Sequence, residues 1–303
     1  MADVGTSVAK FLKHPEHLGE FQNGPTWPLH VSVLCTSRCQ MDCPFCIWHN
    51  RETGKDMDLD VFYGAVRTLY EHGLRAVQLS GGDPFAWPHI DAAISRCNIF
   101  GIPIGIQSNG IQAHEHVEAL KSVKWLRVGI YTDEQMARLR LGEVPKNVNL
   151  SITTVWHKAI ETDFLRRFRD YGRQLGVGYA RVVQDWFAHD SEHAQQAIAL
   201  VKELGTPLVF VPRTNDSTDF CAVAWWKVAM DWFGYLYACG CIGIQGNRRL
   251  PKHLRICRAD KISRFYSRRK PRDLGHRCTP CPYREHNAIL KSALKRVDDP
   301  EFL

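Results

Sequence analysis

Three closely spaced cysteines carry the clearest chemical signal in the sequence. Cys39, Cys43 and Cys46 are spaced C-x3-C-x2-C and follow a largely apolar stretch at 29–34. Cubane iron–sulfur clusters normally take four cysteine ligands, so three thiolates leave one iron open. A metal site that keeps a coordination position free is suited to chemistry, whereas a closed site is structural. The spacing therefore predicts a reactive cluster.

The same residues also allow a structural zinc site. His49 lies three residues past Cys46 and would supply a fourth ligand, and Cys35 is a further candidate thiolate. Cysteine and histidine are the usual ligands of structural zinc. The spacing of the cysteines alone leaves both interpretations open.

The residues around the cysteines favour the cluster. The string TSRCQMDCPFC at 36–46 resembles the signature loop of the radical S-adenosylmethionine (SAM) superfamily, including the aromatic Phe45 before the last cysteine. The resemblance implies that the open iron chelates the amino and carboxylate groups of SAM. It also implies that an electron from the reduced cluster cleaves the sulfonium bond to give a 5'-deoxyadenosyl radical. The protein would supply orientation, a dry pocket and exclusion of competing reactions.

Length and composition predict one large domain, with or without a small appendage. The chain has 303 residues, 45% of them hydrophobic, which suffices for a sizeable core. Its first 17 residues have no apolar core of secretory length, and no run approaches the roughly 18 apolar residues of a membrane span. We therefore expect a cytoplasmic protein without a membrane partner.

The cysteine content indicates metal or redox use. Eleven cysteines occur in a chain without an export signal, and disulfides do not persist in a reducing compartment. Seven are assigned here to clusters. The other four, Cys35, Cys97, Cys241 and Cys257, are expected to be buried or partly buried thiols.

Strand-like apolar runs alternate with helical patterns along the first two thirds of the chain. We expect strands at 29–34, 76–79, 103–107, 126–131, 149–154 and 177–183, and helices at 59–72, 89–100, 114–123, 134–141, 162–175 and 191–204. Six β-α units predict an α/β fold with a parallel sheet and active residues at the carboxyl ends of its strands. The family resemblance implies a partial (β/α)6 TIM-type barrel over residues 27–210. A lead-in with a short helix at 8–13 occupies residues 1–26.

The ends of the second and third strands carry candidate SAM contacts. Gly81 and Gly82 allow the backbone to approach a ligand closely, and Pro84 stiffens the turn. Radical SAM enzymes carry Gly-Gly-Glu-Pro at this point, whose backbone holds the methionyl amino group, so the resemblance implies the same role here with Asp83 in place of glutamate. The third strand ends at Ser108-Asn109, which is either a plain turn or, as the Thr-Asn-Gly that the family places at this point implies, a ribose or carboxylate contact.

Later strand ends supply candidates by location alone. Tyr131 and Asp133 follow the fourth strand, where family members often place polar residues that face the cofactor. Arg181 and Gln184, on the sixth strand, are candidate catalytic residues. Arginine is usually a surface residue, so a solvent-exposed position for Arg181 is the alternative.

A second group of cysteines occupies the C-terminal third. Cys221 is followed by twelve residues, Gly234, four residues and Cys239, and a C-x2-C pair follows at Cys278 and Cys281. A predicted hairpin of 223–230 and 235–238 would bring the first two cysteines together. The pattern resembles the auxiliary-cluster module of the SPASM and twitch subfamilies. It implies the shorter, twitch-like type over 211–303, with a β-hairpin, helices and a second [4Fe-4S] cluster.

The ligand set of this second group stays open. A four-cysteine zinc site is the alternative to the auxiliary cluster. Cys241 and Cys257 stand outside the family pattern, and either could replace one of the four ligands.

The net charge of +7 comes from one segment. Residues 247–277 hold twelve basic and two acidic residues, and the rest of the chain has 27 basic and 30 acidic residues. A concentrated basic segment is a candidate polyanion site, while a solvated face or compensation of cluster charge is the alternative. The candidate nucleic-acid contacts are Arg264, Arg268, Arg269, Lys270 and Arg272.

Three functions of different classes follow. The first is a radical SAM enzyme that abstracts hydrogen from a modified nucleobase in DNA or RNA, for example in phage-type thymine hypermodification, isomerisation or rearrangement. The second is a twitch-type small-molecule dehydrogenase or epimerase, or a peptide-modifying enzyme. The 38 residues before Cys39 are too few for the leader-binding domain that peptide enzymes often carry. The third is a non-catalytic zinc module that binds nucleic acid. An enzyme would use SAM, two [4Fe-4S] clusters and an external electron donor such as flavodoxin or ferredoxin.

Overall fold

A ten-stranded sheet organises the part of the chain that the structure describes. The computed structural model describes residues 14–23, 25–157, 160, 162–188, 191–213, 216–245, 248–269, 278–279 and 281–294. The strand order is β10-β9-β8-β1-β2-β3-β4-β5-β6-β7. The strands are β1 (His30–Thr36), β2 (Ala76–Gly81), β3 (Ile104–Ser108), β4 (Trp125–Gly129), β5 (Asn149–Trp156), β6 (Ala180–Gln184), β7 (Leu208–Val211), β8 (Lys227–Met230), β9 (Tyr235–Tyr237) and β10 (Arg255–Arg258).

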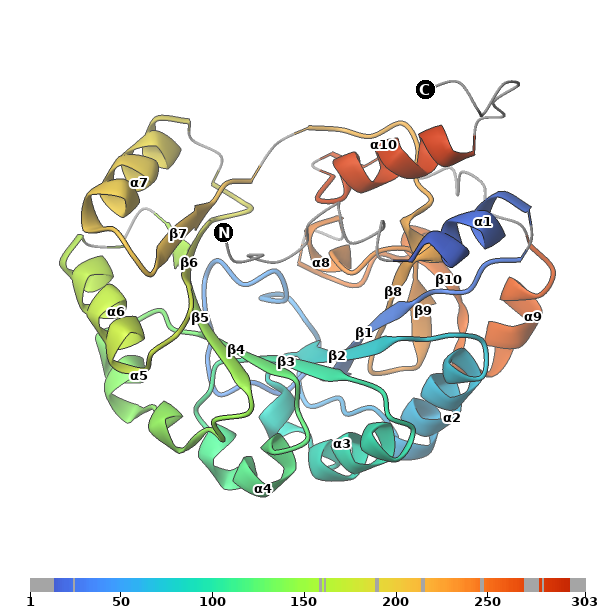
Figure 1. Cartoon of the computed structure of the whole chain (residues 1–303), viewed down its shortest axis with the longest axis horizontal. Helices are drawn as coiled ribbons and strands as arrows, with labels where there is room; N and C mark the ends of the chain where they lie inside the picture. The colour runs from blue at the N-terminus through green and yellow to red at the C-terminus, as the bar shows by residue number, and fades with distance from the viewer. Residues whose placement is uncertain are drawn as a thin grey trace.

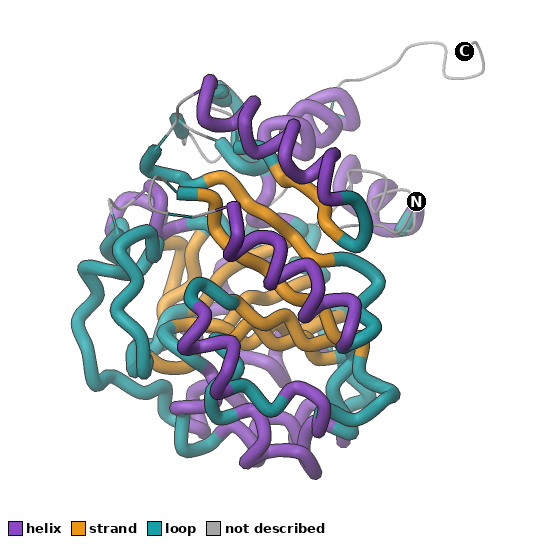
Figure 2. Tube along the Cα trace, turned by 90° about the vertical axis from the view of Figure 1, so that its left-hand side faces the viewer, coloured by secondary structure: helices purple, strands orange, loops and turns teal. Residues whose placement is uncertain are grey.

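The helices cover mainly one side of this sheet. They are α1 (Pro15–Asn23), α2 (Leu59–Tyr70), α3 (Ile90–Ile99), α4 (Val117–Leu120), α5 (Asp133–Arg138), α6 (Thr162–Gln174), α7 (Ser191–Leu204), α8 (Ile242–Gln245), α9 (Ile262–Tyr266) and α10 (Arg284–Ala293). Figure 1 shows the strands as an arc with α2 to α7 along its convex side, and the loop that follows β1 on its concave side. In Figure 2 the helices nearest the viewer lie in front of the strands.

The parallel pairing confirms the predicted α/β class and the partial TIM-type barrel. Strands β1 to β7 each run parallel to the next. Parallel strands need crossover connections, which the predicted helices provide. The expected strands correspond to β1 to β6, and the expected helices at 59–72, 89–100, 134–141, 162–175 and 191–204 correspond to α2, α3, α5, α6 and α7.

The register separates an apolar face from a polar one. Val31 pairs with Val77 and Val33 with Leu79, and all four are at most 1% exposed. Apolar side chains of this face pack against the helices. Alternate positions along the strands point to the opposite, concave face, and they are polar in several strands: Ser32 pairs with Gln78, Gln107 with Arg127, and Thr153 with Arg181.

Four segments differ from the expectation. The helix expected at 114–123 is broken into a 3-10 turn (Ala113–His116) and α4, and neither piece has a side chain that caps its N-terminus. Strands β7 and β10 were not predicted, since four residues show no clear periodicity. Helix α1 lies within the predicted lead-in, whereas the short helix expected at 8–13 lies outside the described residues.

The predicted C-terminal hairpin is present as β8 and β9, but its first strand begins at Lys227 and not at 223, because Val223–Trp225 form a 3-10 turn. Asp231 shapes its turn, because its carboxylate accepts hydrogen bonds from the amides of Phe233 and Tyr235 (both 2.9 Å) and from the Tyr237 hydroxyl (2.7 Å). Gly234 follows with φ of 77°, a conformation that glycine adopts readily. Strand β8 pairs in parallel with β1, so the hairpin extends the barrel sheet. The domain limits at 26 and 210 stay a prediction.

Further 3-10 turns connect the main elements. They are Pro84–Ala86, Leu141–Glu143, Val223–Trp225, Lys252–Leu254 and Ala259–Lys261. Within the described residues, the helices are all too short or too polar to cross a membrane.

Candidate active site

The loop that carries the first three cysteines begins where β1 ends. Its base is closed by hydrogen bonds from the Ser37 amide to the Lys55 carbonyl (2.7 Å) and from the Thr36 hydroxyl to Asp56 (2.6 Å). Arg38 adds an ion pair with Asp56 at 2.9 Å. Because these contacts involve no cysteine, the chain itself fixes the two ends of the loop. We call residues 37–56 the cluster loop.

The three thiols of the cluster loop share one environment. The amides of Met41 and Trp48 donate to the sulfurs of Cys39 (3.4 Å) and Cys46 (3.3 Å). Burial, followed by the neighbouring thiolates of Cys46 and Cys39, raises the pKa of Cys43 to about 12. Hydrogen bonds to cysteine sulfur are among the features by which proteins tune iron–sulfur clusters. The arrangement fits a group that neutralises three adjacent thiolates.

The two extra ligands considered for zinc point elsewhere. The buried Cys35 thiol donates to the Ser80 carbonyl at 3.2 Å, and the His49 Nδ1 lies 3.1 Å from a carboxylate oxygen of Asp42. Among the described residues, no group of three or more His, Cys, Asp or Glu side chains could hold a single metal ion as it stands. The fit to a cluster rests on the spacing of the thiols and on their amide donors.

The glycine pair at the end of β2 approaches the cluster loop itself. The Gly82 amide donates to the Thr36 carbonyl (2.7 Å), and the Asp83 amide donates to the Arg38 carbonyl (2.6 Å). A Cβ atom on Gly81 would lie 2.3 Å from the Thr36 carbonyl oxygen, and one on Gly82 would lie 2.0 Å from that of Arg38. Gly81 also has φ of +134°. The sequence suggested that this glycine pair lets the backbone approach a ligand. In the structure, the pair lets the end of β2 approach the cluster loop.

Asp83 offers a free acceptor beside this docked loop. It is fully buried, and its Oδ1 accepts hydrogen bonds from the Ser108 hydroxyl (2.5 Å) and the Asn109 amide (3.0 Å). Its Oδ2 has no donor at hydrogen-bonding geometry among the described residues, although the Gln40 side chain lies near the carboxylate. A buried oxygen without a donor is costly, so this atom fits a ligand cation such as an ammonium group. Asp83, Ser108 and Asn109, three of the residues predicted to contact SAM, therefore lie together.

Asp83 also gives a prediction about pH. Burial raises the pKa of its carboxyl group to about 6, from an ordinary 3.8. The folded protein thus keeps a proton that the unfolded chain releases, and the free energy of unfolding should fall as pH rises from about 4 to 6, by up to about 3 kcal/mol. Asp83→Asn, which cannot ionise, should lose this dependence. Urea unfolding of the cluster-free protein at several pH values checks it, and equal pH profiles for the two proteins would contradict it.

Asn109 and Gln135 join the ends of β3 and β4 to the cluster loop. The Asn109 side-chain amide donates to Gln40 (2.8 Å) and to the Cys39 sulfur (3.6 Å). Gln135, only 4% exposed, donates to the carbonyls of Asn109 (2.9 Å) and Gly129 (2.6 Å). Its own carbonyl oxygen accepts from the Tyr131 amide (2.9 Å). Sequence reasoning missed Gln135, whose only signal is its position in the first turn of a helix after a strand end.

A cavity of about 630 Å³ lies on one side of the cluster loop. Its wall includes Cys43 and Phe45 from the loop, Tyr131 and Asp133 from the segment after β4, and His157 after β5. The Phe45 ring packs 4.8 Å from Tyr131 and 4.9 Å from His157 between centroids. This size is typical of small-molecule sites, which are largely lined by aromatic and apolar groups. His157 was not predicted.

Asp133 lies at the rim of this cavity. Arg167 donates two hydrogen bonds to its carboxylate (2.8 and 2.6 Å), and the side chain is 48% exposed. These bonds hold the pKa of Asp133 below its usual value. A surface ion pair thus already occupies the carboxylate that was predicted to contact SAM.

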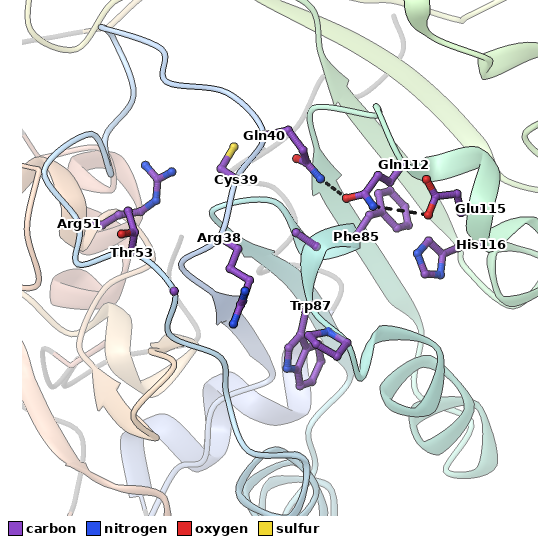
Figure 3. A pocket seen from close by; sticks show the side chains of 13 residues that line it. Arg38, Cys39, Gln40, Arg51, Thr53, Phe85, Trp87, Gln112, Glu115 and His116 are labelled. Atoms are coloured by element: carbon purple, nitrogen blue, oxygen red, sulfur yellow. Dashed lines mark hydrogen bonds between the residues drawn. The ribbon is translucent and has the colours of Figure 1, made fainter.

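A second cavity, of about 660 Å³, opens on another side of the cluster loop. Figure 3 shows the residues that line it, among them Arg38, Cys39 and Arg51 on the loop, and Phe85 and His116 on the segments after β2 and β3. A hydrogen bond from Gln40 to Gln112 spans these segments. Cys39 is therefore accessible from this second cavity, whereas it does not line the first one.

The two predicted catalytic residues on β6 face opposite ways. Arg181 pairs in register with Thr153 on the concave face. Burial, with the nearby cations of Arg127 and Arg213, lowers the pKa of Arg181 to about 9. Gln184 pairs with Trp156, on the face toward the helices, and its carbonyl oxygen accepts from the Arg213 amide at 3.0 Å. Arg181 thus lies on the concave face of the sheet, and Gln184 holds the chain just after β7.

The C-terminal cysteines are also brought together. Cys221, Cys239, Cys278 and Cys281 are each 5–8% exposed. Asn287 links two of their segments, since it accepts from the Ala222 amide (2.9 Å) and donates to the Cys281 sulfur (3.8 Å). The Thr218 amide also donates to the Cys278 carbonyl at 3.2 Å.

The two alternative ligands of this group differ in position. Cys241 shares a hydrogen bond with the Cys239 thiol, which raises the pKa of Cys239 and lowers that of Cys241 to about 6. Cys257 lies on β10, where burial and the charge of Asp260 raise its pKa to about 12. Only Cys241 therefore lies near the predicted ligands.

The predicted nucleic-acid contacts lie on the outside of the fold. Arg264, Arg268 and Arg269 are exposed on or just after α9, and the Arg269 guanidinium stacks 4.7 Å from the centroid of Phe265. Figure 1 shows α9 beside α2, away from the concave side. Lys270 and Arg272 lie outside the described residues. Nucleic-acid binding by this surface stays a prediction.

Curated relatives match part of the chain. The probable GTP 3',8-cyclase of Methanococcus maripaludis is 29% identical over 133 residues, which are 42% of this chain and 43% of the relative. The GTP 3',8-cyclase of Pelotomaculum thermopropionicum is 25% identical over 130 residues, 40% and 39% of the two chains. This chain thus spans about two fifths of the length of the curated relatives that it matches.

Solved structures share the fold over most of the chain. Streptococcus suis SuiB bound to the precursor peptide SuiA gives a TM-score of 0.59 at 16% identity, covering 80% of this chain and 66% of SuiB. Native anSMEcpe with bound AdoMet and Cp18Cys peptide gives 0.57 at 11% identity, covering 91% and 86%. The profile of the radical SAM superfamily matches residues 33–218, which is more than half of the chain. Together with the cysteine loop and the parallel barrel sheet, this match shows that the chain is an enzyme of the radical SAM superfamily.

Proposed function

We propose that this enzyme binds SAM at a [4Fe-4S] cluster held by Cys39, Cys43 and Cys46 and abstracts a hydrogen atom from a nucleobase-bearing substrate. The observation that best supports this radical chemistry is the docking of the cluster loop on Gly82 and Asp83, with the Asp83 Oδ2 atom beside it. When bound, the cluster and SAM supply a 5'-deoxyadenosyl radical. The family membership removes the non-catalytic zinc module from the three functions considered.

The protein's own residues would orient and shield these groups. Asp83 would accept a hydrogen bond from an ammonium group at its free oxygen, and Asn109 would hold Gln40 and Cys39 in place. The rings of Phe45 and Tyr131 would exclude water from the cavity beside Cys43. Gln135, which touches neither cavity, is a positioning residue for the strand ends.

Two observations support a substrate that carries a nucleobase, whether in DNA, in RNA or in a free nucleotide. The curated relatives are named for a reaction of GTP, and the positive charge of the chain is concentrated in 247–277. Hydrogen abstraction from a base inside a duplex would require extrusion of that base, which favours single-stranded or already modified nucleotides. The alternative is a small molecule or a peptide.

A coupled assay tests the proposal. Reconstituted enzyme, SAM and dithionite are incubated anaerobically with nucleotides, single-stranded oligonucleotides, sugars or peptides, and 5'-deoxyadenosine is measured. We expect only the nucleotide-containing mixtures to raise its formation above the substrate-free rate. With a deuterated substrate, deuterium should appear in 5'-deoxyadenosine. Stimulation by a peptide or sugar alone would overturn the choice of substrate, and no cleavage of SAM under any condition would overturn the radical chemistry.

The proposal includes a second [4Fe-4S] cluster at Cys221, Cys239, Cys278 and Cys281. Reconstituted protein should then hold about eight irons, four per cubane, and a Cys278→Ala/Cys281→Ala variant about four. Cys257→Ala, which removes a thiol on β10, should keep about eight. Iron and sulfide analysis checks this. Four irons together with tightly bound zinc in the wild type would contradict the second cluster.

The basic surface around α9 gives a prediction about salt. If Arg264, Arg268 and Arg269 contact phosphates, affinity for oligonucleotides should fall with salt at a log–log slope of about −0.7 to −0.9 per contact. The triple alanine variant should lose most of that slope. Binding to DNA and RNA across a salt series measures it, and equally weak binding by both proteins at low salt would remove this surface from the proposal.

An external electron donor, such as flavodoxin or ferredoxin, completes the proposed reaction. The cavity in Figure 3 leaves Cys39 accessible between Arg38 and Arg51. Arg38 is paired with Asp56, but among the described residues the Arg51 guanidinium bonds only to backbone carbonyls, and its charge would favour the approach of an acidic partner because complementary charge steers association.

A further inference from the structure

The concave face carries three arginines from separate strands. Arg127 is on β4 and pairs with Ser151, Arg181 is on β6 and pairs with Thr153, and Arg213 follows β7 by two residues. Ser151 and Thr153 are alternate residues of β5, so Arg127 and Arg181 point to the same face. Arg127 and Arg213 are near enough to Arg181 that their charges add to the effect of burial in lowering its pKa.

None of the three has a carboxylate partner in the described part of the chain. The Nε atom of each is buried and makes no hydrogen bond, and none takes part in a salt bridge between described residues. The groups that act on Arg213 from nearby are the Cys241 thiol, the Tyr283 hydroxyl and Arg127. Buried cations are normally paired, because an uncompensated one costs free energy.

Aromatic rings hold two of these guanidinium groups in place. Arg127 lies 5.3 Å from the centroid of Trp125, and Arg213 lies 4.4 Å from that of Trp186. Trp125 is itself fixed across Gly105, where a Cβ atom would lie 1.9 Å from the ring. Stacking on a ring orients a guanidinium but leaves its N–H donors free. Two of the three guanidinium groups are therefore positioned by rings, while the Nε–H donor of each arginine has no partner among the described residues.

We propose that Arg127, Arg181 and Arg213 bind a phosphate group of the substrate on the concave face of the sheet. The inference rests on the proposed function, because it takes the substrate to be a nucleotide. Arginine binds phosphate through several N–H donors at once, and three cations match a multiply charged phosphate better than a single carboxylate. A phosphate held at β4, β6 and β7 leaves the side of β1 to β3, where the cluster loop docks, for the reacting part of the substrate.

Calorimetric titration of the reconstituted enzyme with inorganic pyrophosphate tests this site without turnover. We expect Arg127→Gln and Arg181→Gln each to weaken pyrophosphate binding about tenfold or more, since each removes a charged hydrogen-bond donor. Arg181→Lys should lose less. The matched control is Arg67→Gln on α2, an exposed arginine paired with Glu71 at 2.9 Å, which should bind as the wild type does.

A stability measurement separates binding from folding. Without ligand, Arg181→Gln should be at least as stable to urea as the wild type, because it removes a partly buried cation that has no carboxylate partner among the described residues. Equal pyrophosphate affinity of wild type and both glutamine variants would overturn the site. Tighter binding of citrate than of pyrophosphate would overturn the phosphate assignment. Wild type that never cleaves SAM, with pyrophosphate binding lost in the variants, would refute the proposed function and leave the anion site standing.

Discussion

Cys43→Ala should abolish the reductive cleavage of SAM to 5'-deoxyadenosine. Two thiolates cannot hold a cubane that keeps one iron open, and Cys43 is the thiol whose pKa the other two affect directly. The loop should still fold, because its ends are closed by Ser37, Lys55 and Asp56 and not by cysteine. Chromatography of 5'-deoxyadenosine, together with iron analysis, measures the result. The same loss is expected for Cys39→Ala and Cys46→Ala.

Cys97→Ala is the matched control for the loss of a thiol. Cys97 is 1% exposed on α3, and burial alone raises its pKa to about 12, so it lies in the core away from other charged groups. Its replacement should cost about 1 kcal/mol of stability through a small cavity and leave cleavage intact. Cleavage that survives in any of the three loop variants would refute the assignment of the open cluster.

Gly82→Ala should be nearly as damaging, although it removes no ligand. The new methyl group would lie 2.0 Å from the Arg38 carbonyl oxygen. That backbone cannot retreat easily, since the amides of Gly82 and Asp83 hold the loop at 2.7 and 2.6 Å. Overpacking of this kind costs about 1–3 kcal/mol, and a misplacement of about 1 Å at a reacting centre can cost about 100-fold in rate. We expect both losses, measured by urea unfolding and by 5'-deoxyadenosine formation.

Gly64→Ala provides the contrast on the same substitution. Gly64 is exposed in α2, and a Cβ atom there would meet nothing within 4 Å. Alanine in a helix interior should raise stability by about 0.5–1 kcal/mol and leave cleavage unchanged. If Gly82→Ala behaves like Gly64→Ala, the docking of the cluster loop on β2 does not control the site.

The sequence predicted the parts of the fold that repeat. Six alternations of strand and helix are visible because apolar periodicity is local, and the cysteines are visible because ligand spacing is local. Strand β10 was hidden, because its residues read as part of a basic segment and it becomes a strand only by pairing with β9. The glycine pair was predicted, but its contact with Arg38 depends on the docking of two segments that lie about forty residues apart.

The residues that complete the site were harder to predict. Gln135 and His157 carry no motif, and their roles arise from strand ends that meet in space. Arg127 and Arg213 join Arg181 only through the register of β4 to β7, which a single sequence does not fix. Each arginine alone looks like a surface residue. Their lack of partners appears only in three dimensions.

Because β8 pairs in parallel with β1, the C-terminal hairpin covers what would otherwise be an exposed edge of the barrel sheet. Without it, β1 would become an edge strand with a row of unpaired N–H and C=O groups, the usual template for aggregation. The hairpin tip adds a second attachment, because Gly234 packs against Val61 of α2 so closely that a Cβ atom would lie 2.7 Å from it. A chain cut after β7 would expose both surfaces, so the cysteine-bearing C-terminal third and the barrel should unfold as one cooperative unit.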